Sequence, residues 1–549
     1  MNRPNPAIVS QAGARPLARW ALLLVCAAYL LPGQFGRDAW RHADLVAFGF
    51  VDALAEGRTG WLRPLLAGQP TPDGALLPYW LGALSVKLLP LLDAALAARL
   101  PFLFALAMVL ALVWYATFHL SRTDAAQPVS FAFGGEAGTL DYARAMADCA
   151  VLALMASLGL LQLGHETTPE LLQLLGVAWW LYALAAAPFR RWRARLSAVA
   201  AILVLALSGA AQFAVLLGLG GFLLCQFSRQ DGARQARLAL ALAVVLAIAV
   251  ATALELWRWR LQAPAMPSTL RLLAWFTWPT AALAAWTVWR WRGYLSHRHV
   301  SVPLTLAALA LLACMGMGGS ERALLLALPG LALLAAFALP TLSRSLSAML
   351  DWFSLFFFSA AMLALWLYFA ALHTNALPRM SRSLQRLLAE DWSARFDGPA
   401  FFVAIAGSVA WLLLVRWRTS RQRQALWRSL VLPAGGTAVV WLLAMTLMLP
   451  ALDHARSNRT LLGQLQTVLP ADVNCVQVAP TQLSLAATLE AQGGWTVRTD
   501  EARSGCDWAV KVVARAQAED VAPGWRLVAA LARPAERSNR YQVLRRQSS

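Results

Sequence analysis

Charged residues are scarce in this sequence, and long polar stretches are few. Only 14% of the 549 residues are charged, whereas 59% are hydrophobic and the mean hydropathy is +0.55. A water-soluble protein of this size needs more charge to cover its surface, so the composition excludes that class. Apolar runs long enough to cross a bilayer recur along most of the chain. These runs predict a polytopic α-helical membrane protein.

Acidic residues are the scarcer of the two charge types. The chain has 28 acidic residues against 47 lysines and arginines, which gives a net charge of +19. A basic balance can indicate nucleic-acid binding. Here the arginines lie mainly in short gaps between apolar runs, which indicates membrane topology and contact with anionic lipids instead. We therefore expect membrane lipids, and no nucleic acid, as partners.

Cysteine is also scarce, with six residues in the chain. No C-x-x-C or comparable metal-binding spacing is present, so no cofactor is predicted and a divalent metal stays an open alternative. Two cysteines, Cys475 and Cys506, lie in the polar C-terminal part. The other four lie in or beside apolar runs and are expected to be small core residues: Cys26, Cys149, Cys225 and Cys314.

Hydropathy predicts about 13 membrane spans. The first run lacks a good cleavage pattern, so we interpret it as an uncleaved span with a cytoplasmic N-terminus in a bacterial inner membrane. A further run at 75–92 contains Lys87 and is bounded by prolines, which favours an interfacial or re-entrant helix. The predicted spans lie near 18–35, 96–119, 146–163, 170–188, 194–208, 210–227, 237–256, 270–289, 301–317, 323–341, 347–371, 398–415 and 429–449.

The charge of the gaps between spans tests this topology. Cytoplasmic gaps carry an excess of lysine and arginine. One odd-numbered gap opens with "WRWR" at 257–260 and counts against the scheme. An odd number of spans places residues 452–549 in the periplasm. The even-numbered, densely basic gaps are 190–195, 228–237, 290–299 and 416–428.

The C-terminal part differs in character from the rest of the chain. After a multi-span domain at 1–451, residues 452–549 alternate apolar and polar stretches with turn signals, which predicts a small α/β domain. In an oxidising periplasm, Cys475 and Cys506 could form a disulfide that closes a loop of roughly 30 residues. Two buried free thiols are the alternative.

The gap after the first span, 36–95, is too long for a simple connector. It opens with "GRDAWRHADLVAFG", which places five ionisable side chains within eight residues at a bilayer edge. Acids alone would suit a cation, and arginines alone would suit lipid headgroups. Together they suit a general base beside a phosphate leaving group. The five side chains are Arg37, Asp38, Arg41, His42 and Asp44.

This loop resembles that of the polyprenyl-phosphate-dependent membrane glycosyltransferases of the GT-C superfamily. The nearest kind is the aminoarabinose lipid A transferase and protein O-mannosyltransferase group. Its first outer loop begins with Asp-Glu followed by Arg-Tyr-Ala-Glu, and "DAWRHAD" stands at that place here. Asp38 matches the motif aspartate, Arg41 the arginine and Asp44 the later acid. The departures in this stretch are Ala39 for the glutamate and His42 for the tyrosine.

The resemblance continues through "WLRPLLAGQPTPDGALLPYWL", which is similar to the family's "W…PRLNG…YFEKPPLPYWL" pattern. Asp73 stands at the glutamate of the family's Glu-Lys pair, and Gly74 replaces the lysine that contacts the lipid phosphate in that family. Later segments are similar at "TTPELL" and "GGSERALLLALPG", which contain Glu170 and Arg322.

The resemblance implies a sugar transfer by direct displacement with inversion, from a polyprenyl-phosphate donor to a lipid, glycan or protein acceptor on the periplasmic face. Each candidate has a non-catalytic alternative: a solvated helix end, a headgroup anchor, a snorkelling lysine or a solvated turn. The candidates are Asp38 and Asp44 for catalysis, Arg41, Arg322 and Lys87 for the donor phosphate, and Asp73, Glu170 and His165 as acceptor-binding or auxiliary groups.

Two rival functions remain at this stage. A transporter or flippase of a lipid-linked sugar would share the fold and the phosphate-binding arginines. It would not need the acid cluster, and it would more often show an internal repeat. A catalytically degenerate partner protein is the second rival, favoured by Ala39 and Gly74.

Overall fold

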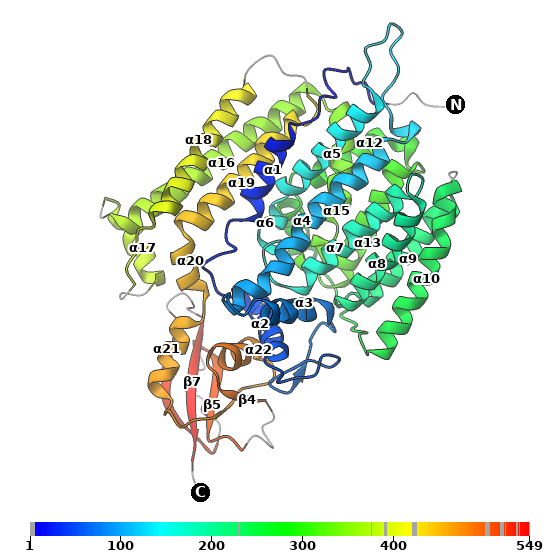
Figure 1. Cartoon of the computed structure of the whole chain (residues 1–549). Coiled ribbons are helices and arrows are strands. Elements are labelled where there is room, and N and C mark those ends of the chain that lie inside the picture. Colours follow the sequence, from blue (N-terminus) through cyan, green and yellow to red (C-terminus); the bar gives the residue numbers. More distant parts are fainter. Residues whose placement is uncertain are drawn as a thin grey trace.

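A large bundle of helices makes up most of the molecule, and a small sheet lies beyond one of its ends (Figure 1). The computed structural model describes residues 6–228, 231–374, 376–388, 392–419, 425–499, 505–515, 521, 523–533, 536 and 538–547. The helices are α1 (Arg19–Leu30), α2 (Arg41–Ala55), α3 (Leu77–Leu88), α4 (Ala94–Ser121), α5 (Thr139–Ala156), α6 (Leu158–Leu163), α7 (Pro169–Ala186), α8 (Arg191–Leu207), α9 (Ala211–Gln226), α10 (Asp231–Ala253), α11 (Met266–Phe276), α12 (Thr280–Arg290), α13 (Arg298–Gly316), α14 (Glu321–Leu325), α15 (Leu328–Ala338), α16 (Arg344–His373), α17 (Pro378–Leu388), α18 (Gly398–Thr419), α19 (Arg428–Leu447), α20 (Leu449–Arg456), α21 (Arg459–Val468) and α22 (Leu483–Ala487).

The membrane-spanning character of the bundle rests on its long apolar helices. Within the described residues, 7 helices are long and apolar enough to cross a membrane, namely α4, α7, α10, α13, α16, α18 and α19. Three of the predicted spans consist instead of two helices end to end: α5 with α6, α11 with α12, and α14 with α15. The helical membrane class is therefore observed, while the count of about 13 spans stays a prediction.

The run at 75–92 forms α3, which has 12 residues. At 1.5 Å per residue such a helix is about 18 Å long, too short for a hydrocarbon core of about 30 Å. Figure 1 shows α2 and α3 together at the end of the bundle that faces the sheet. This placement fits the interfacial alternative for the segment.

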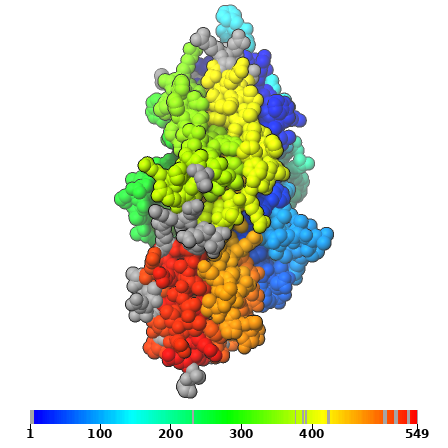
Figure 2. All heavy atoms as spheres, turned by 90° about the vertical axis from the view of Figure 1, so that its left-hand side faces the viewer, coloured from blue at the N-terminus to red at the C-terminus, as the bar shows by residue number. Residues whose placement is uncertain are grey.

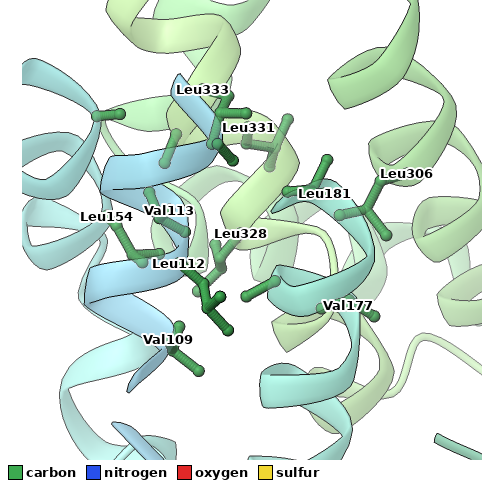
Figure 3. Packing of buried hydrophobic residues seen from close by; sticks show 14 of the residues in the cluster. Val109, Leu112, Val113, Leu154, Val177, Leu181, Leu306, Leu328, Leu331 and Leu333 are labelled. Carbon is green, nitrogen blue, oxygen red and sulfur yellow. The ribbon is translucent and has the colours of Figure 1, made fainter. Parts of the chain in front are cut away.

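The core of the bundle is built by α4, α5, α7, α13 and α15. Small and branched apolar side chains from these helices interdigitate at its centre (Figure 3). α4 is apolar on nearly all sides, and many of its residues are buried among the neighbouring helices. Helices that are apolar all round are typical of a buried position within a membrane bundle. The labelled core residues are Val109, Leu112, Val113, Leu154, Val177, Leu181, Leu306, Leu328, Leu331 and Leu333.

The loops sort into two groups at opposite ends of the bundle. At the end far from the sheet, the N-terminal segment bonds the loop at 122–138 through Gln11 N–H and Gly135 O, and it bonds the start of α19 through Leu426 N–H and Gly13 O. At the sheet end, the loop after α10 bonds the loop before α14 through Gln262 N–H and Gly316 O. This sorting agrees with the odd and even gaps of the predicted topology, and it puts the exceptional "WRWR" gap at the sheet end.

The C-terminal residues form a five-stranded sheet with the order β4-β3-β5-β7-β6. β3 pairs in parallel with β4 and β5, whereas β7 runs antiparallel to β5 and β6. α21 and α22 pack against the sheet through one apolar cluster. Figure 2 shows this unit as a separate mass beyond the helical part. Its strands are β3 (Cys475–Gln477), β4 (Thr496–Arg498), β5 (Trp508–Ala514), β6 (Trp525–Leu531) and β7 (Asn539–Arg546), and a small hairpin, β1 (Leu65–Leu66) with β2 (Gln69–Pro70), belongs to the first loop.

The sheet unit packs directly on α2. Ala487 of α22 belongs to the same apolar cluster as the buried face of α2. Gly49 makes this close approach feasible, because a Cβ at that position would lie 2.7 Å from the Cβ of Ala487. The helix that begins with the acid cluster is thus fixed against the C-terminal part of the chain.

A disulfide joins Cys475 at the start of β3 to Cys506, just before β5. The Cα atoms are 5.4 Å apart, an ordinary distance for a disulfide. The two half-cystines are 31 positions apart, so the bond ties β3 to the central strand β5, with which β3 pairs in parallel.

We expect the double substitution Cys475→Ser/Cys506→Ser to lower the free energy of unfolding by about 2–4 kcal/mol, because the bond restricts the unfolded chain. Thermal unfolding of the purified protein, with and without reductant, measures the change. The matched control is Cys26→Ser, which removes a free thiol. Thiol labelling of both Cys475 and Cys506 in denatured, non-reduced protein from intact cells would contradict the bond.

Candidate functional site

Asp38 lies in the extended segment just before α2 and is 7% exposed. One of its carboxylate oxygens accepts a hydrogen bond of 2.7 Å from the hydroxyl of Ser457, and the other pairs with the guanidinium of Arg459. The side chain of Arg459 is 72% exposed, so the cation reaches solvent while the acid does not. The Asp38 carboxylate is therefore buried and bonded at both oxygens, and its partner Arg459 lies between it and solvent.

Asp453 at the end of α20 fixes the backbone around Asp38. One of its oxygens accepts both the Asp38 N–H at 2.8 Å and the Trp40 indole N–H at 2.7 Å. The guanidinium of Arg37 lies 4.9 Å from the centre of the Trp40 ring, and that of Arg456 lies 5.3 Å from it. The segment before α2 is thus clamped between the first loop and the residues that follow the last span.

Asp44 lies in the first turn of α2 and is fully buried. One carboxylate oxygen accepts the Trp40 N–H at 2.8 Å, which satisfies a backbone donor at the helix start. The other accepts the Thr167 N–H at 2.8 Å, from the loop between α6 and α7. Both oxygens are thus used to join two loops.

A buried arginine of α4 holds the first loop in place. Arg99 is 2% exposed and donates to the carbonyl oxygens of Gln34 at 2.7 Å and Arg37 at 2.6 Å. The Arg37 guanidinium in turn donates to the carbonyl oxygen of His165. These bonds anchor the turn between α1 and α2, so the backbone around Asp38 cannot move freely.

Arg322 at the start of α14 lies between Glu166, in the loop before α7, and Glu170, in the first turn of α7. It donates to Glu166 at 2.7 Å and to Glu170 at 3.0 Å. His165, in the same loop, places its Nδ1 2.6 Å from Leu161 O and its Nε2 2.8 Å from Tyr29 O. Burial lowers the pKa of His165 to about 4. Glu170 and Arg322 are therefore brought together, whereas the His165 ring is tied to backbone oxygens.

Asp73 is held in the loop before α3. Its carboxyl oxygens accept the Ala75 N–H and the Tyr79 hydroxyl, each at 2.9 Å. Burial raises the pKa of Asp73, outweighing the Ala75 N–H, and the negative charge of Glu170 adds to the rise. Asp73 is therefore close enough to Glu170, the partner of Arg322, to feel its charge.

The "WRWR" segment lies beside Asp73 and Gly74. A Cβ on Gly74 would meet Leu256 O at 2.9 Å and the Arg258 Cγ at 3.2 Å, and the φ of Gly74 is +70°. Only glycine adopts this conformation readily in so little space. The guanidinium of Arg260 donates to the carbonyl oxygen of Pro72. Two arginines from a distant loop therefore lie beside Gly74 and Pro72.

Arg41 and Lys87 are the other two residues predicted to bind the donor phosphate. Arg41 begins α2, but its side chain lies outside the described residues. Lys87 lies in the exposed last turn of α3, with its ammonium 5.6 Å from the centre of the Trp61 ring. Within the part of the chain that the structure describes, Lys87 makes no hydrogen bond or ion pair with Asp38 or Arg322.

Sequence reasoning missed the groups that contact Asp38 from the other end of the chain. Ser457 and Arg459 lie 419 and 421 positions after Asp38. A signal was present, since "LDHARSNR" is a charged stretch directly after the last apolar run. It also missed Arg258 and Arg260, although their gap stood out as the basic exception. No cluster of three or more His, Cys, Asp or Glu that could hold a metal ion occurs among the described residues.

These features define a class of fold: a helical membrane bundle whose loops at one end collect buried acids and arginines under a small sheet unit. No family model and no curated protein sequence matches the chain. Two solved structures match it over nearly their whole length: ArnT from Cupriavidus metallidurans bound to undecaprenyl phosphate, and the same protein in the apo state.

Both matches have a TM-score of 0.60 and 15% sequence identity, and both cover 96% of this chain. They cover 98% and 97% of the ArnT chain. The resemblance to GT-C enzymes expected from the first loop is therefore confirmed at the level of the fold.

Proposed function

We propose that this chain is a membrane glycosyltransferase that moves a sugar from a polyprenyl-phosphate donor to an acceptor hydroxyl at the periplasmic face of a bacterial inner membrane. The observation that carries the proposal is a buried carboxylate, Asp38, held beside arginines at one end of a membrane bundle. The bound undecaprenyl phosphate of the ArnT structure supports a lipid-phosphate ligand for this fold. The N-terminus is then cytoplasmic, and the sheet unit, residues 452–549, is periplasmic.

Asp38 acts as the general base in this proposal. It takes the proton from the acceptor hydroxyl while that oxygen bonds to the anomeric carbon of the sugar. The bond from this carbon to the phosphate oxygen breaks, and polyprenyl phosphate leaves. Ser457 orients the carboxylate, and Arg459 moves from Asp38 toward the developing phosphate charge, which frees the base. Asp44, with both oxygens bonded to backbone, positions the loop.

The donor phosphate is bound by arginines at the sheet end of the bundle. Arg258 and Arg260 take the place of the lysine that Gly74 replaces, since they lie beside it. A guanidinium suits phosphate oxygens because its donors form a planar fork. Arg322 is the next phosphate ligand, with Glu166 and Glu170 keeping it in place. Lys87 and Arg41 are headgroup contacts at the rim. Asp73 and His165 support the neighbouring loops.

Purified full-length protein, mixed with synthetic polyprenyl-phosphate donors that carry hexoses, pentoses or aminopentoses, tests the proposal. We expect sugar transfer to extracted cell-envelope acceptors together with release of polyprenyl phosphate. A protein without transfer that moves the intact lipid-linked sugar across proteoliposomes would establish the transporter instead. A protein that does neither would favour the degenerate partner.

A further inference from the structure

A cavity of about 460 Å³ lies between the start of α2, the turn from α20 to α21 and the C-terminal sheet unit. We call it the interdomain cavity and define it by six of its lining residues. None of Asp73, Glu170 or Arg322 lines it, so the cavity is separate from the group formed by Arg322 and its neighbouring acids. Its volume falls in the range of small-molecule sites, about 300–1,000 Å³. The defining residues are His42, Arg456, Asn458, Ser484, Glu536 and Tyr541.

Asn458 gives the cavity an unsatisfied polar group. The residue is 8% exposed, and its Nδ2 donates to the Thr488 hydroxyl at 2.6 Å. Its Oδ1 is buried and has no hydrogen-bond partner among the described residues. Buried polar atoms in folded proteins are nearly always paired, so this oxygen calls for an O–H or N–H donor from a bound molecule.

The other walls offer hydroxyl, imidazole and carboxylate groups beside the cation of Arg456. The Ser484 hydroxyl lies 3.3 Å from His42 Nε2. Glu536 is used within the sheet unit, since it accepts from the Tyr541 hydroxyl at 2.8 Å and from Asn539 at 2.7 Å. Hydroxyl, amide and imidazole groups can each donate and accept hydrogen bonds. The hydroxyl groups of a sugar do both as well, so the two sets are complementary.

The turn at 456–459 joins the cavity to Asp38. Arg456 and Asn458 line the cavity. The residues that alternate with them, Ser457 and Arg459, contact the Asp38 carboxylate. A molecule bound in the cavity is thus separated from Asp38 by a single turn of backbone.

We propose that the interdomain cavity binds the hydroxyl-rich sugar part of the acceptor and presents its free hydroxyl toward Asp38. The acceptor would then be a glycan or a glycolipid. The identification of the bound sugar as the acceptor rests on the proposed function, whereas the binding of a sugar in the cavity does not.

Saturation-transfer NMR on detergent-solubilised full-length protein tests the proposal. The probes are the methyl glycosides of glucose, galactose, mannose and N-acetylglucosamine. We expect at least one glycoside to bind the wild type. Asn458→Leu should weaken it about tenfold, which corresponds to about 1.4 kcal/mol. Ser484→Trp, which fills the cavity, should abolish binding. Thr496→Trp, an exposed position of β4 outside the cavity, is the matched control and should bind normally.

Binding of polyprenyl phosphate, measured on the same variants, separates the two proposals. It should be unchanged in Ser484→Trp, because Arg258, Arg260 and Arg322, the proposed phosphate ligands, do not line the cavity. Absence of glycoside binding, or equal binding to wild type and Ser484→Trp, would overturn the cavity assignment. Glycoside binding without any polyprenyl phosphate binding would leave the cavity intact and reject the donor proposed for the transferase.

Discussion

Replacing Asp38 with asparagine is expected to lower the rate of sugar transfer at least about 10²-fold, the usual scale for loss of a general base. Asparagine keeps the shape and can still accept the Ser457 hydrogen bond, but it cannot take a proton. The amide also loses the ion pair with Arg459, whose cation is then free for the donor phosphate. The effect should therefore appear in kcat, with donor KM unchanged or lower.

The matched control for this variant is Asp52→Asn. Asp52 lies in α2, 14 positions after Asp38, and it also pairs with an arginine, Arg58. Asp38 precedes this helix, and Asp52 makes no hydrogen bond or ion pair with Asp38, Ser457 or Arg459 within the described residues. Its substitution should leave transfer within about twofold of wild type. Normal transfer by Asp38→Asn, at wild-type thermal stability, would remove Asp38 as the base and make Asp73 the next candidate.

The double substitution Arg258→Ala/Arg260→Ala should raise the donor KM and the Kd for polyprenyl phosphate by about 100-fold. Each charged hydrogen bond to a phosphate contributes about 1.5–3 kcal/mol, or roughly tenfold or more per arginine. The value of kcat at saturating donor should fall far less than in Asp38→Asn, since the base is intact. Calorimetric binding of polyprenyl phosphate in detergent, with steady-state kinetics, measures both quantities.

Arg63→Ala is the control for this pair. Arg63 belongs to the first loop and pairs with Glu255 at 2.9 Å, but the side chains are 80% and 71% exposed. An exposed pair of this kind contributes about 0–1 kcal/mol, so donor binding should hardly change. Equal loss of affinity in Arg63→Ala and in the double variant would mean that the arginines act only through the general positive charge of this surface.

The fold was largely predictable from the sequence because its main signals are local. Apolar runs the length of a bilayer predict helices wherever they occur, and each predicted span contains helix in the structure. The tail was predicted as a small α/β unit from alternation and turn residues. The span count was less secure, since runs such as 270–289 divide at Pro279 into two shorter helices that hydropathy alone cannot separate.

The site was only half predictable, because its contacts are long-range. The dense charge of the first loop and its resemblance to a known family both indicate Asp38 and Asp44 as candidates. Nothing in that loop indicates that Ser457 and Arg459 meet Asp38 from beyond the last span. Arg258 and Arg260 were read as an exception to a charge rule that concerns topology. Their position beside Gly74 gives this exception a local reason.

The turn at 457–459 also sets the order in which the contacts of Asp38 can form during synthesis. The ribosome completes the whole bundle before it makes the residues that hold the Asp38 carboxylate. During synthesis that acid is present for more than four hundred residues without its partners. Contact of residues 457 and 459 with the first loop is thus a late step of assembly. A copy that ends before residue 457 would lack both of these contacts to the Asp38 carboxylate.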